Sequence, residues 1–156
     1  MPSLAYNKRA NYDYEISDKY EAGLVLFGHE VKSIRGGNIS LKGAFITIKN
    51  SNAGTPELYL INAYVPLYKK TSNIDNYDPE RSRKILLHKN QIKRLIGKKQ
   101  EQGLTMVPIS VYTKHNLIKI EFGIGRGKKK IDKRETIKKR DVDRQIRTLT
   151  KQKIIT

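Results

Sequence analysis

The sequence predicts a mainly β fold, a small antiparallel barrel with short flanking helices and a flexible basic tail at its C-terminus. Three observations predict it. Apolar residues alternate with period two in several segments rich in Tyr, Ile and Val, only two segments before residue 125 have helical spacing, and beyond that point the alternation stops among glycines and lysines. A chain of 156 residues is long enough for one hydrophobic core.

The expected strands group into two hairpins and one long strand. Residues 14–26 alternate weakly, and residues 44–49 and 57–63 flank a Ser/Asn/Gly/Pro loop at 50–56, which predicts a hairpin. A second hairpin is predicted for 104–112 and 117–125, around the turn Lys114-His115-Asn116.

The expected helices cover residues 28–35, with Val31 and Ile34 facing inward, and residues 89–102, where Ile92, Leu95 and Ile96 form the apolar side before Gly103. Asp78-Pro79 has the pattern of a helix N-cap and predicts a short turn before the apolar run 85–87, which we expect to be buried. Short antiparallel strands with peripheral helices are typical of an OB-like barrel.

The last part of the chain differs from the rest. Asp132 and Glu135 have the spacing of a capping box, and Ile137, Val142, Ile146 and Leu149 form a narrow apolar stripe. An isolated helix of this kind is marginal in water. We therefore expect a barrel over residues 1–125 and a tail over 126–156 that is disordered alone and helical against a partner.

The charge of the chain indicates its partner. The 32 Lys and Arg against 15 Asp and Glu give a net charge of +17, and residues 126–156 alone carry 13 basic and 4 acidic side chains. A monomer with this charge would repel itself unless a polyanion were nearby. Nucleic acid is the expected partner.

The chain lacks the residues and motifs that most classes of enzyme use in catalysis. The chain has no Cys, the three His are far apart without metal-ligand spacing, and no nucleotide-binding or hydrolase motif occurs. Asp13, Glu15, Asp18 and Glu21 could hold Mg²⁺ for a nuclease, but acids on a half-exposed strand are more often there for solubility. We expect no cofactor, no metal and no enzyme activity. The start of the chain has no signal-peptide run and no segment is long enough to span a membrane, so we expect a cytoplasmic protein.

Two features have more than one interpretation. Gly123-x-Gly125-x-Gly127, followed by lysines, is either a close contact with an RNA backbone or a solvated linker. Glu30 lies in a basic stretch, where a carboxylate either accepts hydrogen bonds from unpaired bases or forms a local salt bridge.

Taken in order, several segments resemble the small protein B family, the SsrA-binding proteins of bacteria. They are Asn7-Lys8-Arg9-Ala10, Tyr20-Glu21-Ala22-Gly23, Glu30-Val31-Lys32-Ser33-Ile34-Arg35, Asp78-Pro79-Glu80-Arg81-Ser82-Arg83-Lys84, Leu86-Leu87-His88-Lys89, Arg126-Gly127-Lys128-Lys129 and Asp132-Lys133-Arg134. The resemblance extends over residues 7 to about 140.

The resemblance implies an OB-like barrel that binds the tRNA-like domain of transfer-messenger RNA and rescues stalled ribosomes by trans-translation, delivered with elongation factor Tu. It implies a monomer that meets small-subunit ribosomal RNA through its tail. The RNA-binding residues it implies, together with neighbouring cations, are Asn7, Lys8, Arg9, Glu30, Lys32, Arg35, Arg81, Arg83, Lys84, Leu87, Arg126, Lys128 and Lys129. The implied ribosome-binding residues of the tail are Lys130, Asp132, Lys133, Arg134, Lys138, Lys139 and Arg140.

One departure and one alternative accompany the resemblance. Ile131 stands where many relatives have His or an aromatic residue able to stack on a base, which affects that one contact. The alternative function is a structural ribosomal protein, a basic barrel held permanently in ribosomal RNA. The two differ in whether the protein leaves the ribosome at high salt.

Overall fold

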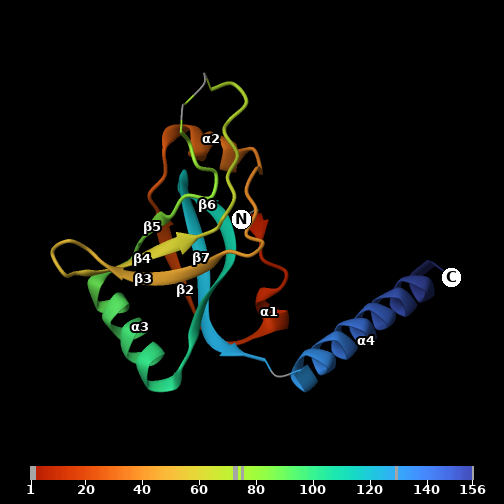
Figure 1. Ribbon diagram of the computed structural model, residues 1–156. Coiled ribbons are helices and arrows are strands. Elements are labelled where there is room, and N and C mark those ends of the chain that lie inside the picture. The colour runs from red at the N-terminus through yellow and green to blue at the C-terminus, as the bar shows by residue number, and fades with distance from the viewer. Residues whose placement is uncertain (1–2, 72–73, 75, 129, 156) are drawn as a thin grey trace.

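The computed structural model describes residues 3–71, 74, 76–128 and 130–155. Within them, seven strands form one antiparallel sheet in the order β1-β6-β7-β2-β5-β4-β3 (Figure 1). The strands are β1 Ser3–Tyr6, β2 Tyr14–Leu24, β3 Phe45–Asn50, β4 Pro56–Ile61, β5 Arg83–Leu86, β6 Thr105–Lys114 and β7 Leu117–Gly127. The helices are α1 Ala10–Asp13, α2 Gly28–Arg35, α3 Lys89–Gln102 and α4 Lys130–Ile155.

The sheet curls into a nearly closed barrel. β1 and β3 are its two edge strands, and β3 lies against β6 without pairing with it. The interior holds fully buried side chains such as Leu58, Leu60, Ile120 and Phe122, which come from β4 and β7. The mainly β, OB-like barrel predicted from the alternation is confirmed.

The two predicted hairpins are confirmed, and the second has a tight turn. β6 and β7 pair up to Lys114 and Leu117, so His115 and Asn116 alone make the connection. Both residues have positive φ, 51° and 64°, which is the backbone of a two-residue type I′ turn. This turn matches the right-handed twist of the strands that it joins.

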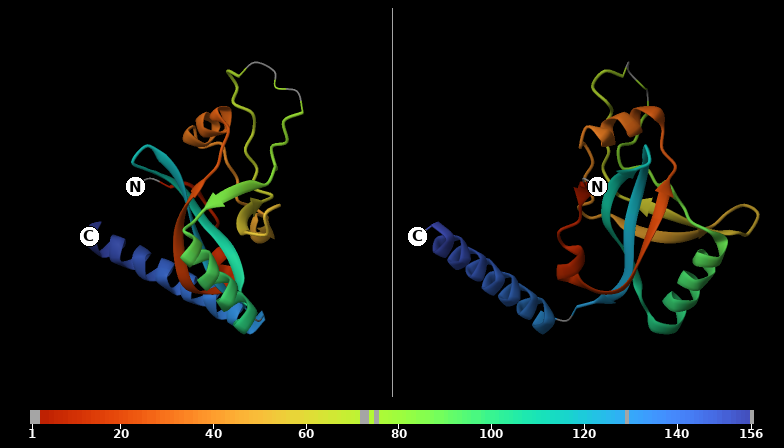
Figure 2. Two further views of the ribbon diagram at one scale, coloured as in Figure 1. Left: turned by 90° about the vertical axis from the view of Figure 1, so that its left-hand side faces the viewer. Right: turned by 180° about the vertical axis from the view of Figure 1, so that it is seen from behind.

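Helices α2 and α3 have the bounds that the apolar spacing predicts. They lie at opposite ends of the barrel (Figure 2), and Ile34 and Leu95 place their apolar sides in the core. Gly103 ends α3 with φ 61°, a left-handed conformation that favours glycine.

The structure corrects the expectations for residues 78–87. The predicted short turn is present, but Asp78 caps no helix: its Oδ1 accepts the Glu80 N–H at 2.9 Å, and its carbonyl accepts the Arg81 N–H at 3.2 Å. The following run is strand β5, in which Ile85 is buried but Leu86 is 51% exposed. A strand with one buried face alternates, whereas the apolar run alone suggested uniform burial.

The glycines at the expected boundary are structural. Gly123 and Gly125 are buried within β7, where a β-bulge brings β2 very close. A Cβ on Gly125 would lie 2.2 Å from the Glu15 carbonyl oxygen, so only glycine fits. Neither is part of a linker or an exposed phosphate loop, and β7 continues to Gly127, two residues past the expected boundary.

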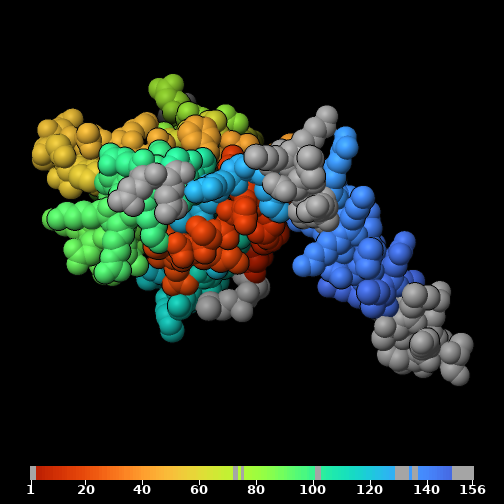
Figure 3. Space-filling model, turned by 90° about the horizontal axis from the view of Figure 1, so that it is seen from below, coloured from red at the N-terminus to blue at the C-terminus, as the bar shows by residue number. Residues whose placement is uncertain are grey.

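The tail is one long helix. The helix expected from Asp132 begins at Lys130 and runs to Ile155, extending from the barrel as a separate arm (Figure 3). It approaches the barrel at α1 and at the start of β2, and Ile137, Val142 and Ile146 are about half exposed. That this helix forms only against a partner stays a prediction.

Candidate nucleic-acid interface

Glu30 is the centre of a buried ion-pair network at the start of α2. Its carboxylate has no exposed surface and accepts hydrogen bonds from Arg83 Nε at 2.8 Å, Tyr77 Oη at 3.1 Å and the Phe27 N–H at 2.8 Å. Arg81 binds the same carboxylate with two donors, Nε at 3.0 Å and Nη2. Both carboxylate oxygens are therefore fully occupied within the chain.

This network keeps Glu30 ionised. Burial alone would raise the pKa of the carboxyl group, but hydrogen bonds from Arg81, the Phe27 N–H and Arg83 outweigh it and hold the pKa below its ordinary value. The same burial and the charge of Glu30 raise the pKa of Tyr77. The site therefore contains a negative charge at neutral pH.

The structure corrects the expectation of direct RNA contact for Glu30 and Arg83, because neither side chain has exposed surface. Arg83 donates to the carbonyls of Ala63 at 2.7 Å and Pro79 at 2.9 Å as well as to Glu30. It ties the segment before β5 to the barrel. The salt-bridge interpretation of Glu30 is the one that the geometry supports.

The network holds Arg81 against an exposed aromatic ring. The Arg81 guanidinium carbon lies 4.0 Å from the centre of the Phe27 ring, and Phe27 is 53% exposed. Val25 and Leu86 are 46% and 51% exposed, and the Val25 carbonyl accepts a hydrogen bond from Arg81 Nη2 at 3.5 Å. Gly23 pairs with Leu86 and the Val25 N–H bonds the Lys84 carbonyl, so Val25, Lys84 and Leu86 share the outer face of β2 and β5. We call Val25, Phe27, Arg81 and Leu86 the Phe27 platform.

Two elements that adjoin the Phe27 platform, β5 and α2, carry cations. Lys84, on the same face, has its Nζ 3.2 Å from Glu57 and is 41% exposed. Lys32 is exposed on α2 and lies over the Tyr68 ring at 5.9 Å. Leu87, which directly follows β5, is half-buried and packs against the core. Exposed rings beside cations are the combination with which proteins stack on unpaired bases and neutralise phosphates.

A second group of the expected residues lies elsewhere, near α1. Asn7 uses its side chain to fasten the N-terminal segment, since Nδ2 donates to the Pro108 carbonyl at 2.9 Å and Oδ1 accepts the Arg9 N–H at 3.2 Å. Lys128 Nζ donates to the Asn11 carbonyl at 2.7 Å. Lys8, Arg9 and Arg126 are exposed in this region. RNA contact by this group stays a prediction.

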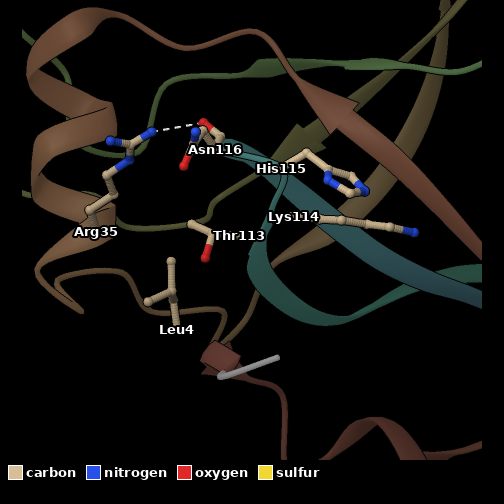
Figure 4. A pocket seen from close by; sticks show the side chains of 6 residues that line it. All are labelled: Leu4, Arg35, Thr113, Lys114, His115 and Asn116. Carbon is tan, nitrogen blue, oxygen red and sulfur yellow. Dashed lines mark hydrogen bonds between the residues drawn. The ribbon is translucent and has the colours of Figure 1, made fainter.

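Arg35 lies neither at the Phe27 platform nor in the group near α1. It points from the end of α2 across a hollow of about 620 Å³ towards the turn of β6 and β7 (Figure 4). Its Nη2 donates to the Asn116 carbonyl at 2.7 Å. Lys114 and His115 line the same hollow, so Arg35 contributes to a cationic surface beside the turn.

In the tail, Arg134, Lys138, Lys139 and Arg140 are exposed on α4. Lys129 and the side chains of Lys130, Ile131, Asp132 and Lys133 lie outside the described part of the chain. Contacts of the tail with a ribosome stay a prediction.

Three of the four acids considered for metal binding, Asp13, Asp18 and Glu21, pair with cations or hydroxyls. Asp18 pairs with Lys98, and Glu21 pairs with Tyr112 and Lys114, whose hydrogen bonds lower the Glu21 pKa. Among the described residues, no three His, Asp or Glu side chains gather as metal ligands. Within the same residues, no helix is long and apolar enough to span a membrane.

Sequence reasoning missed Phe27 and Tyr77. Both come from loops beside predicted elements, and neither lies in a periodic pattern that marks it as exposed or buried. The available signal was the position of Phe27 directly before the helix that carries Glu30, where a side chain at the N-cap lies close to the third helical residue.

Comparisons with known proteins cover almost the whole chain. A family model described as SmpB protein matches residues 4–152. The SsrA-binding proteins of Enterococcus faecalis and Thermosipho africanus are 49% and 47% identical over 147 residues, 94% of this chain and 92% and 95% of theirs. A solved chain described as "tmRNA-SmpB: a journey to the center of the bacterial ribosome" is 44% identical, with a TM-score of 0.62 over 80% of this chain and 84% of that one. The similarity includes the barrel and most of the tail.

Proposed function

The chain belongs to the SmpB protein family, and on that premise we propose that it binds transfer-messenger RNA, the SsrA RNA, and acts with it on the ribosome in trans-translation. The family consists of RNA-binding proteins. The net charge of +17 and the near-complete coverage of the relatives support this function. It is also the function that the sequence motifs imply.

The observation that carries the choice of RNA-binding face is the Phe27 platform. Exposed rings and apolar side chains are costly in water unless they are covered, and here they lie beside a guanidinium that a buried carboxylate holds in place. Unpaired bases of a folded RNA stack on such surfaces, and Lys84 on the same sheet face is available for its phosphates, as is the exposed Lys32 of α2. The platform is our candidate for contact with the tRNA-like domain.

The finer parts of the function follow the family resemblance. The exposed cations of α4 are suited to ribosomal RNA of the small subunit, with the barrel binding the first RNA and the tail the ribosome. Elongation factor Tu as delivery partner, a monomeric state and residence in the cytoplasm belong to the same proposal.

The test is binding of the full chain to a transfer-messenger RNA tRNA-like domain and to an ordinary tRNA of equal length, at low and raised salt. A preference for the former that survives raised salt supports the proposal, because phosphate contacts alone weaken steeply with salt. Equal binding that fades with salt would contradict it.

Two further measurements sharpen this test. Phe27→Ala should weaken binding to the tRNA-like domain, whereas Leu117→Ala, which removes a similarly exposed apolar side chain from the β6–β7 hairpin, should leave it unchanged. Washing ribosomes at high salt distinguishes the proposed function from the alternative, because a structural ribosomal protein stays in the particle whereas a rescue factor leaves it.

A further inference from the structure

A groove of about 470 Å³ lies between α3 and the β3–β4 hairpin. Figure 1 shows both elements on the side of the barrel opposite the arm α4. We call it the α3 groove, and the residues that line it are Ile48, Asn50, Pro56, Ile96, Lys99 and Gln100. None of them belongs to the Phe27 platform or to the group near α1, so the proposed function leaves this groove without a role.

The floor of the α3 groove is aliphatic. Ile48, Pro56 and Ile96 are half-buried, and the two isoleucines pack against the main core. Among the described residues that line the groove, none has an aromatic ring. Unpaired bases bind proteins by stacking on rings, whereas an aliphatic floor suits an apolar side chain.

Two amide side chains complete the lining. Asn50 and Gln100 are exposed, and neither side chain forms a hydrogen bond with a described residue. Each amide offers both a donor and an acceptor, which are the groups that an extended peptide backbone requires. The groove therefore combines an apolar floor with hydrogen-bonding groups for a polypeptide.

The helix beside the groove has an excess of positive charge. α3 contains five basic residues and one acid, and its first turn has no acid to offset the positive end of the helix. Lys89 and Lys93, like Arg94 and Lys98, are like charges four residues apart, which destabilises a helix. Of the five cations, only Lys98 pairs with an acid of the described residues. A bound anion would relieve this repulsion.

Two of these cations flank the apolar floor. Lys93 and Lys99 lie three residues before and three residues after Ile96, so all three side chains are neighbours on one side of α3. Both lysines are exposed, and neither pairs with a described acid. The complementary ligand has an apolar side chain with carboxylates on either side of it.

Positive charge alone suits RNA as well as an acidic protein, but the floor distinguishes the two. A phosphate group loses its hydration over aliphatic side chains and gains no stacking there. A peptide uses the floor, the amides and the cations together. We propose that the α3 groove binds an acidic segment of a partner protein, which inserts one apolar side chain between Ile48 and Ile96. This inference does not rest on the RNA-binding role of the Phe27 platform.

The probe is a short fluorescent peptide with acidic residues on both sides of one leucine, and its binding to the full chain is followed by fluorescence anisotropy. A second peptide has glycine in place of the leucine and the same charge. It should bind roughly 10- to 150-fold more weakly, the loss of one buried leucine side chain. Because this change is made in the peptide, it leaves the folding of the protein untouched.

The protein variant combines Lys93→Gln with Lys99→Gln and should bind the peptide roughly 2- to 30-fold more weakly, the loss of two exposed ion pairs. The matched control combines Lys19→Gln with Lys70→Gln, which removes the same charge from two exposed lysines outside α3 and should bind like the unchanged chain. Thermal melting verifies that both variants fold.

Isoleucine methyl signals in nuclear magnetic resonance spectra locate the bound peptide, which should shift Ile48 and Ile96. Three results would overturn the inference: equal binding of the leucine and glycine peptides, equal weakening in the two double variants, or shifts confined to isoleucines outside the groove. Displacement of the peptide by a single-stranded RNA that itself requires Lys93 and Lys99 would also overturn it, because the groove would then be a nucleic-acid site.

Discussion

Replacing Glu30 by Ala should unfold the chain more readily and should weaken RNA binding only through its effect on Arg81. The change leaves the Arg83 guanidinium buried without its carboxylate, and removing one partner of a buried ion pair costs about 3–5 kcal/mol. For a chain of this length, this loss lowers the melting temperature by roughly 6–20 °C. The matched control is Glu57→Ala, which removes a partly exposed carboxylate from Lys84 and should change stability far less.

The measurement is urea unfolding followed by circular dichroism, together with binding to the tRNA-like domain at a temperature where the variant is folded. Binding should weaken because Arg81 loses the carboxylate that holds it over Phe27. A loss of stability below about 1 kcal/mol, the value of a surface pair, would refute the role of the buried network. Unchanged RNA binding would refute the link from Glu30 to the platform.

Three other predictions follow from the structure. The pKa of Glu30 is lowered in the folded chain, so the stabilisation that its charge provides is complete above the ordinary pKa of 4.5 and is lost as the pH falls through the lower, folded pKa. The free energy of unfolding of Glu30→Gln should therefore depend less on pH in this acid range than that of the unchanged chain. Identical pH profiles for the two proteins would contradict the prediction. Gly125→Ala should cost at least about 1–3 kcal/mol in urea unfolding, because its Cβ would meet the Glu15 backbone, whereas Gly127→Ala, with open space around it, serves as the control. Truncation before Asp132 should leave binding to the tRNA-like domain nearly intact and abolish tagging on stalled ribosomes, and tagging that persists would show that the tail is dispensable.

The elements with strong periodicity were predictable from the sequence. Helix α3 has Ile92, Leu95 and Ile96 on one side and Gly103 at its end, and the β6–β7 hairpin alternates on both sides of a short polar turn. Local spacing decides such elements, since each buries one face. The short elements β1, α1 and β5 were not predicted as elements, because four residues contain too little pattern to distinguish a strand or helix from a loop.

The family motifs and the excess of positive charge were also readable from the sequence, and they predicted that the chain binds RNA. Tertiary structure decided what the motif residues do. Glu30 lies about fifty residues before Arg81 and Arg83 in the chain, and only the folded barrel brings the three side chains into one network. An acid among cations looks the same in a sequence whether it faces solvent or a buried guanidinium, because burial depends on residues far along the chain. The same holds for Gly125, whose need for glycine comes from a bulge in the neighbouring strand.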